Sequence, residues 1–245
     1  MYKKIIHILL AALLLVYLAF SFAFISPKVD TEKECRDIQI KIMTNGEYAY
    51  LSDPQIETLL EKANIRLKGQ KMSEIQTRSI EKVLEESKLV RNVEVYKTID
   101  GTVVIRAYQR IPILRVISDR GNYYVDTERE IMSVPLYYAA HVPVATGAIS
   151  NEYATNQLCD FANFLRKNKS WNEAIEQIHI LPNLDVELIP RKGNHTIVLG
   201  KIENYKENLD KLTLFYEKGL NKVGWNKYSR INLKYKNQVI CTKRE

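Results

Sequence analysis

A long apolar run near the N-terminus, Ile5–Ile25, constrains this chain more than any other stretch of its sequence. It is rich in Leu, Ala, Ile and Phe, contains no charged residue, and is interrupted only by His7 and Ser21. As an α-helix its 21 residues would span roughly 30 Å, the thickness of the hydrocarbon core of a bilayer. Because a helix satisfies its own backbone hydrogen bonds in lipid, we predict a transmembrane helix over residues 5–25, preceded by a cytoplasmic tail of residues 1–4.

Two other interpretations of this run compete with a membrane anchor. Ser21-Phe22-Ala23 has the small-x-small form of a signal-peptidase site, which would make the run a cleaved secretory signal. The apolar stretch is longer than the core of a signal peptide and continues past Ala23, and this favours an uncleaved anchor. A buried helix of a globular core is the weaker alternative, because the run has no polar face.

The charges on the two sides of the run do not by themselves fix its orientation. Lys3 and Lys4 precede it, and the basic residues that follow it are Lys28, Lys33 and Arg36. The positive-inside rule counts only basic residues, and these nearly balance. Because so short a tail is easily kept in the cytoplasm while a long C-terminal region is translocated, we expect a single-pass membrane protein whose C-terminal domains lie outside the cytoplasm.

Composition favours a folded, strand-containing region after the anchor. The remaining residues, about 220 of them, are enough for one large domain or two small ones. Fifteen tyrosines and many β-branched residues favour strands. The net charge of +7 is uneven, because residues 218–245 hold eight Lys or Arg and one acidic residue. A solvated basic surface is the simplest explanation, and an acidic partner or an anionic membrane surface is the functional alternative.

Residues 35–108, after a connector over 26–34, have the element order of a small α+β unit. Alternating apolar residues predict strands over 35–43, 89–97 and 102–108, with turns at 44–47 and at Asp100-Gly101. Two helices are expected between the first and second strands, one beginning at Ser52-Asp53-Pro54 and one over roughly 73–87. Two helices packed on one face of a three-stranded sheet would bury all of these apolar stripes.

The second half of the chain is expected to be a mixed, β-rich domain with helices. Apolar residues at helical spacing predict helices over 151–167 and from Tyr205 to Leu220. The predicted strands cover residues 113–117, 122–126, 175–180, 185–189 and 195–199. A terminal strand pair is predicted over 230–241, with its turn near Lys236-Asn237-Gln238.

Several motifs resemble those of the bacterial cell-division family FtsQ (DivIB). Leu89–Val95 and Asp100–Ile105, followed by Arg110-Ile111-Pro112, are similar to a strand, a return strand and an "E-R-x-P" exit in the POTRA domain of that family. Tyr123–Asp126 and Val142–Gly147 are similar to motifs of its β domain. The likeness covers nearly the whole chain. It implies a POTRA domain at 35–111 and an FtsQ-type β domain at 112–245.

No pattern of catalytic or metal-binding residues is found. The histidines at positions 7, 141, 179 and 195 are scattered, and none belongs to a nucleophile or metal motif. Cys35, Cys159 and Cys241 lie far apart in the sequence. Three buried, inert thiols are expected, and one disulfide with one thiol left over is the alternative. We therefore expect a non-enzymatic protein with no cofactor, metal site, small-molecule substrate or nucleic-acid partner.

Binding at a sheet edge is the activity that the sequence favours. A terminal strand such as Ile231–Cys241 can present free N–H and C=O groups, to which an extended partner segment adds by backbone pairing. The alternative is that this strand is only the last rung of the core sheet. Asn232–Tyr235 followed by Val239 resembles the strand on which the FtsQ family docks its small coiled-coil partners, FtsB and FtsL. The resemblance implies a partner-binding site made of Lys234, Tyr235, Lys236, Asn237, Gln238, Val239 and Ile240.

The function that the resemblance implies is a bitopic membrane scaffold of the divisome at the division septum. It would bind FtsB- and FtsL-like partners outside the cytoplasm and link them to septal peptidoglycan synthesis. A POTRA-containing factor for the assembly of outer-membrane or secreted proteins is the alternative. Such factors usually carry several POTRA units, and only one is readable in this sequence.

Overall fold

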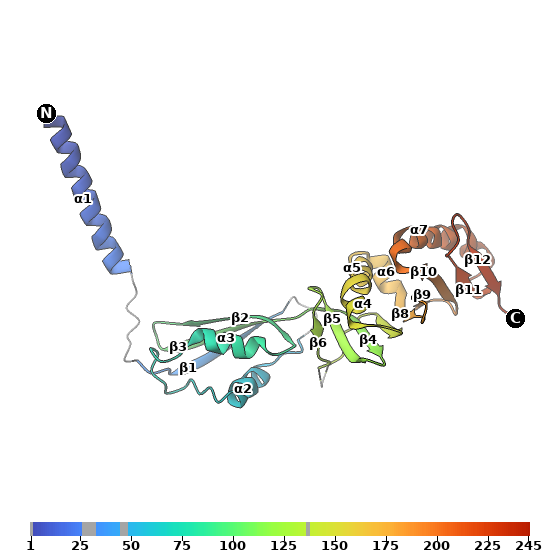
Figure 1. Ribbon diagram of the computed structural model, residues 1–245, viewed down its shortest axis with the longest axis horizontal. Helices are drawn as coiled ribbons and strands as arrows, with labels where there is room; N and C mark the ends of the chain where they lie inside the picture. Colours follow the sequence, from blue (N-terminus) through green and yellow to red (C-terminus); the bar gives the residue numbers. More distant parts are fainter. Residues whose placement is uncertain (1, 26–32, 45–48, 136–137) are drawn as a thin grey trace. The chain divides into compact units, whose positions relative to one another are not determined.

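The structure, a computed structural model, describes residues 2–25, 33–44, 49–135 and 138–245 (Figure 1). Most of the predicted connector at 26–34 and of the predicted turn at 44–47 lies outside these residues. The chain divides into two compact units. The first comprises Met1–Ile42, Asp53–Glu86 and Asn92–Ala107, and the second comprises Met43–Ser52, Ser87–Arg91 and Tyr108–Glu245.

The N-terminal apolar run is helical. Helix α1 (Tyr2–Ile25) contains the predicted segment and starts three residues earlier. Its described apolar side chains are exposed, with Leu13 at 70% and Tyr17 at 68%. Counting only the residues that the structure describes, no helix is long and apolar enough to cross a membrane. The membrane span over 5–25 therefore stays a prediction.

The first unit is built on a three-stranded sheet with two helices, as the sequence predicted. Its strands are β1 (Asp37–Met43), β2 (Val90–Lys97) and β3 (Thr102–Gln109), in the order β1-β3-β2. The helices are α2 (Asp53–Lys62) and α3 (Thr77–Glu85). Ile56 of α2 and Leu84 of α3 are fully buried. These apolar stripes form the core of the unit.

Helix α3 starts later than the predicted residue 73. The backbone N–H of Met72 donates to the carbonyl of Lys33 at 2.8 Å, and Lys71 forms an antiparallel bridge with Glu34. Residues 72–74 then form a turn, in which the N–H of Glu74 donates to the carbonyl of Lys71 at 3.0 Å, and Gln76 precedes the first turn of the helix. The predicted start was wrong because an apolar pattern reveals neither the pairing nor the turn.

The second unit is built on a mixed sheet of nine strands. Its strands are β4 (Pro112–Ser118), β5 (Gly121–Asp126), β6 (Ile131–Met132), β7 (Val144–Gly147), β8 (Ile175–Ile180), β9 (Asp185–Pro190), β10 (Thr196–Lys201), β11 (Tyr228–Asn232) and β12 (Ile240–Lys243). The spatial order is β12-β11-β10-β9-β8-β7-β4-β5-β6. The pairs β4–β7, β7–β8 and β10–β11 are parallel, and the other neighbours are antiparallel. The predicted strands of this half are confirmed.

Two helical segments pack on this sheet, as predicted (Figure 1). The first is continuous over α4 (Asn151–Tyr153), the π-helical η1 (Ala154–Leu158) and α5 (Cys159–Lys167). The second runs through η2 (Ile202–Asn204), α7 (Tyr205–Phe215), η3 (Tyr216–Leu220) and α8 (Asn221–Val223). Phe161 and Leu212, one from each segment, are fully buried in the same core.

A short helix, α6 (Lys169–Ala174), was not predicted. Asn168 ends the preceding helix in an extended conformation, and its side chain accepts a hydrogen bond from the backbone N–H of Trp171. An asparagine in this conformation caps a new helix. No element was predicted between the helix over 151–167 and the strand over 175–180.

Candidate partner-binding edge

Strand β12 forms one edge of the nine-stranded sheet. It pairs antiparallel with β11, with Ile231 opposite Cys241 and Asn232 opposite Ile240. Among the described residues no strand pairs with its other side. One row of its backbone N–H and C=O groups is therefore open to an added strand. Ile240 is 48% exposed at the start of this edge, which makes it an apolar contact for such a strand.

Most of the residues predicted to bind a partner lie in the hairpin loop, residues 233–239, that joins β11 to β12. The turn lies where the sequence predicted it, with Asn237 at φ 57° and the N–H of Gln238 donating to the carbonyl of Tyr235. Tyr235 is 52% exposed, and Lys236 is also exposed. Val239 instead packs against the core. Only Ile240 of the predicted set belongs to the edge strand.

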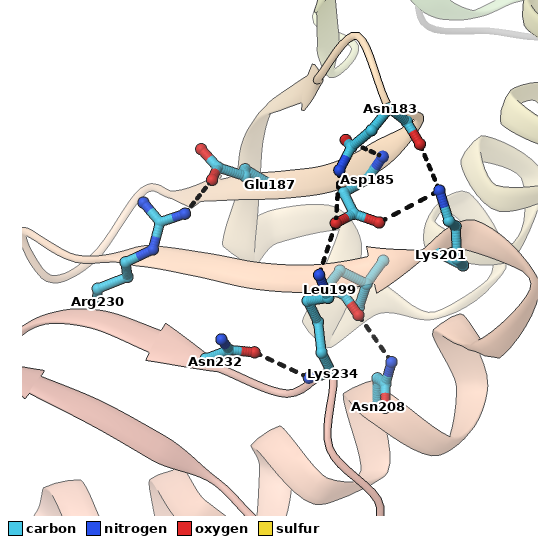
Figure 2. A network of polar contacts seen from close by, with 9 residues as sticks. All are labelled: Asn183, Asp185, Glu187, Leu199, Lys201, Asn208, Arg230, Asn232 and Lys234. Carbon is cyan, nitrogen blue, oxygen red and sulfur yellow. Dashed lines mark hydrogen bonds and ion pairs between the residues drawn. The ribbon is translucent and has the colours of Figure 1, made fainter.

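Lys234 differs from the other predicted residues because its ammonium group, on a side chain that is 42% exposed, is bound to a carboxylate of the sheet (Figure 2). Its Nζ donates to Oδ2 of Asp185 at 2.7 Å, and the same carboxylate lies 3.4 Å from Nζ of Lys201. The side-chain amide of Asn183 donates to Asp185 as well, at 3.2 Å. Asp185, at the start of β9, thus holds the beginning of the hairpin loop.

This network shifts the titration of both partners. The hydrogen bond from Lys234, supported by Lys201, lowers the pKa of the Asp185 carboxyl below its usual value even though burial opposes this. The bond to Asp185 in turn raises the pKa of Lys234. Both groups therefore stay charged, and Lys234 is suited to positioning the loop.

Gly200 makes room for this contact. It lies in β10 at a register shift against β9, with φ +84°. A Cβ atom at this position would lie 2.7 Å from Cγ of Lys234. A side chain here would therefore displace Lys234 from Asp185. A glycine inside a strand is a sequence signal for a bulge or a close approach, and this one could have been noticed in the sequence.

Helix α7 fixes the other side of the loop. Nζ of Lys211 donates to the carbonyls of Leu233 at 2.7 Å and of Tyr235 at 3.0 Å. The buried amide of Asn208 donates to the carbonyl of Leu199 in β10 at 2.8 Å, which ties α7 to the sheet (Figure 2). The loop backbone is thus anchored on two sides while the side chain of Tyr235 faces solvent.

A second ion pair supports the sheet close to this edge. Arg230 of β11 pairs with Glu187 of β9, across the intervening strand β10 (Figure 2). Together with the Lys234–Asp185 pair it links β11 and the loop to β9. The edge is therefore attached to the sheet by side chains in addition to the ladder of β10 and β11. None of these pairs was predicted from the sequence.

Two of the four histidines make side-chain contacts within the second unit. Nδ1 of His179 lies 2.9 Å from Oγ1 of Thr146, and Nε2 of His195 lies 2.8 Å from the hydroxyl of Tyr216. His7 lies in α1 and His141 in a loop before β7. Within the residues that the structure describes, no three His, Cys, Asp or Glu side chains group as metal ligands.

The three cysteines are free thiols. Cys35 and Cys159 are buried, as expected, whereas Cys241 on the edge strand is only partly buried. Burial raises the pKa of all three thiols. The raised values make these sulfurs poor nucleophiles, since the thiolate is the reactive form.

The folded part of the chain combines a POTRA-like unit with a larger β-rich unit that ends in an open edge strand. Residues 33–108 match the family model of the POTRA-like domain, and residues 111–242 match the model described as "FtsQ/DivIB, C-terminal related". The second match alone covers more than half of the chain. This chain therefore belongs to the FtsQ/DivIB family, as its motifs indicated. Membership implies a scaffold role in cell division.

Solved structures are also similar to this chain. The chain is similar to the major extracytoplasmic domain of the trans isomer of the bacterial cell division protein DivIB from Geobacillus stearothermophilus. The two share 16% identity with a TM-score of 0.29, and the match covers 41% of this chain and 86% of the other. No curated protein matches this chain.

Proposed function

We propose that this chain is a non-enzymatic, single-pass scaffold of the bacterial divisome. Residues 5–25 anchor it in the inner membrane, with residues 1–4 in the cytoplasm. The POTRA domain at 35–111 and the β domain at 112–245 lie in the periplasm at the division septum. There the protein binds FtsB- and FtsL-like partners and connects them to septal peptidoglycan synthesis.

The observation that carries the proposal is the open edge of β12 beside an exposed, basic hairpin loop. An extended partner segment adds to β12 and continues the sheet by one strand, so that backbone pairing provides the affinity. Ile240 contributes an apolar contact, and Tyr235 contributes an amphipathic ring of the kind found at binding hot spots. The positive charge of Lys236 and of the chain end favours an acidic partner segment.

Lys234 acts on this surface indirectly. Its ammonium group is bound to Asp185, so its role is to hold the loop in the conformation that the partner meets. A charge reversal at Lys234 would place two carboxylates side by side and disturb the fold of the loop. The residues that test partner contact are therefore Tyr235 and Lys236, whose side chains are exposed.

Co-purification tests the proposal. The full chain carrying Tyr235→Ala and Lys236→Glu should no longer recover the FtsB- and FtsL-like proteins from detergent-solubilised membranes. The matched control is Lys167→Glu, which reverses an exposed charge on α5. Recovery that is equal in the loop variant and in the wild type would remove the hairpin loop from the interface.

Two cellular measurements test the rest of the proposal. Topology reporters fused to each end should place the N-terminus in the cytoplasm and the C-terminus in the periplasm, and the reverse result would overturn the orientation. Depletion of the protein should give filaments without septa. Loss of outer-membrane proteins with normal septa would instead favour the assembly-factor alternative.

A further inference from the structure

The only two tryptophans of the chain line the same cavity. Trp171 comes from α6 and Trp225 from the segment between α8 and β11, far apart in the sequence. The cavity has a volume of about 550 Å³, and its wall also includes Pro190 and Tyr216. This volume lies within the range of small-molecule sites, roughly 300–1,000 Å³. The cavity belongs to the second unit and does not include the hairpin loop.

The aromatic wall of the cavity is held in place by contacts with a buried histidine and between its own rings. The hydroxyl of Tyr216 lies 2.8 Å from Nε2 of His195, which is only 4% exposed. The rings of Tyr216 and Trp225 are in contact, with centroids 4.9 Å apart. Trp225 itself is 37% exposed and thus reaches solvent, whereas Trp171 is half-buried against the core. The cavity therefore has a preformed aromatic face that a ligand can reach from solvent.

The rim of the cavity carries polar groups that the described part of the chain does not use. Arg191, Lys192 and Glu217 line it, are exposed, and have no ion-pair or side-chain hydrogen-bond partner among the described residues. Asn168 uses its amide oxygen to cap α6, which leaves its NH₂ group available. Hydrogen-bond donors and acceptors, including side chains of positive and of negative charge, therefore surround the aromatic face.

An aromatic face surrounded by charged and polar side chains favours one class of ligand. A lipid chain would require a wall without charged groups, and a polyanion would not sit beside Glu173 and Glu217. A pyranose ring has an apolar C–H face that stacks on an aromatic ring, and hydroxyl groups at its edge that both donate and accept hydrogen bonds. We propose that this cavity is a saccharide-binding site, in which the sugar ring lies on the face of Trp225 and its hydroxyl groups pair with Arg191 and Glu217.

The proposal rests on side chains that the partner-binding edge does not use. The cavity is lined from α6, the β9–β10 connection, α7, η3 and the α8–β11 segment, whereas the edge consists of β12 and the loop before it. A variant of one site should therefore leave the other intact, so the two proposals can fail separately.

Intrinsic tryptophan fluorescence measures the binding directly, because every tryptophan of the chain lies at the cavity. The full chain, kept in a detergent without a sugar headgroup, is titrated with tetra-N-acetylchitotetraose and with cellotetraose. A tetra-alanine peptide serves as the comparison ligand. We expect a saturable change in emission with at least one saccharide and none with the peptide.

Substitutions then assign the signal to the cavity. Trp171→Phe should keep binding, reported by Trp225 alone. Adding Glu217→Ala to this variant should weaken binding by roughly ten- to 100-fold, the loss expected when one hydrogen bond to a charged group is removed. The control is Tyr235→Ala in the partner-binding loop, which should titrate like the wild type.

The proposal is overturned if neither saccharide gives a saturable change, or if Glu217→Ala binds as tightly as its parent. It is also overturned if the peptide saturates the signal while the saccharides do not, since the cavity would then be a peptide-binding site. Circular dichroism of each variant verifies that a lost signal is not a lost fold.

Discussion

The guanidinium group of Arg110 donates from Nη1 to Oδ2 of Asp126 at 2.8 Å, inside the second unit. The other carboxylate oxygen accepts the backbone N–H groups of Glu128 and Glu130, each at 2.8 Å. Asp126 is 1% exposed, so these donors take the place of water around its carboxylate. Two of the motifs that resemble the FtsQ family, the exit after β3 and the end of β5, are thus joined by one buried ion pair.

Removing one partner of this pair should be strongly destabilising. Asp126→Ala leaves the partly buried Arg110 without its counterion and two backbone N–H groups without their acceptor, and should lower the free energy of unfolding by about 3–5 kcal/mol. Urea unfolding followed by tryptophan fluorescence measures this, because both tryptophans lie in the second unit. The control is Asp160→Ala, which breaks the exposed pair with Arg129 and should cost less than about 1 kcal/mol. Equal losses in the two variants would contradict a special role for burial.

The Asp185–Lys234 pair should give the second unit an acid-sensitive contribution to stability. The pKa of Asp185 is lowered in the folded state, chiefly by the hydrogen bond from Lys234, so the unfolded chain binds more protons near the ordinary value of 3.8. The contribution is therefore fully present above that value and is lost as the pH falls through the lower folded pKa.

Unfolding measured from neutral pH to below about pH 4 tests this contribution. Asp185→Asn should be less stable than the wild type at neutral pH, and the difference should shrink as the solution is acidified. Asp119→Asn, which removes an exposed carboxylate in a turn, is the matched control. A constant offset for Asp185→Asn would show that the pair contributes nothing dependent on protonation.

Gly200 should tolerate substitution poorly for two separable reasons. At φ +84° an alanine meets the backbone cost of the left-handed region, and its Cβ collides with Cγ of Lys234. Gly224→Ala has only a backbone cost, because at φ 93° and ψ 141° a Cβ atom would meet nothing within 4 Å, and it should lose about 1–3 kcal/mol. Gly200→Ala should lose more than this control.

A double substitution separates the two costs at Gly200. In a Lys234→Ala background the collision is absent, so Gly200→Ala should then cost no more than Gly224→Ala. Urea unfolding of the four variants gives the comparison. If the excess cost persists without the Lys234 side chain, another contact of β10 must explain it.

The sequence was informative where structure is local. The alternation of Val93 and Val95, the hairpin at Asp100-Gly101 and the terminal turn near Lys236-Asn237-Gln238 depend on neighbouring residues, and each was predicted correctly. The three-stranded sheet with two helices followed from the order of such elements. The late start of α3 was missed, because a turn at residues 72–74 follows the pairing of Lys71 and Met72 with residues 33–34.

The candidate site was only partly predictable. The loop and the edge strand were expected, but the sequence does not show that Lys234 of this loop pairs with Asp185, 49 positions away. The cavity was missed for the same reason. Trp171 and Trp225 come together only once the β9–β10 connection and helix α7 are placed. Long-range register in a mixed sheet decides both arrangements.

Hydrogen exchange at the sheet edge is the most direct test of strand addition to β12. In the free protein the outward backbone N–H groups of Ile240–Lys243 should exchange rapidly, since no described strand pairs with them. Binding of the FtsB- and FtsL-like proteins should slow their exchange and leave the opposite edge, β6, unchanged. If the partners bind while exchange in β12 stays fast, the partner segment does not add to this edge and the account is wrong.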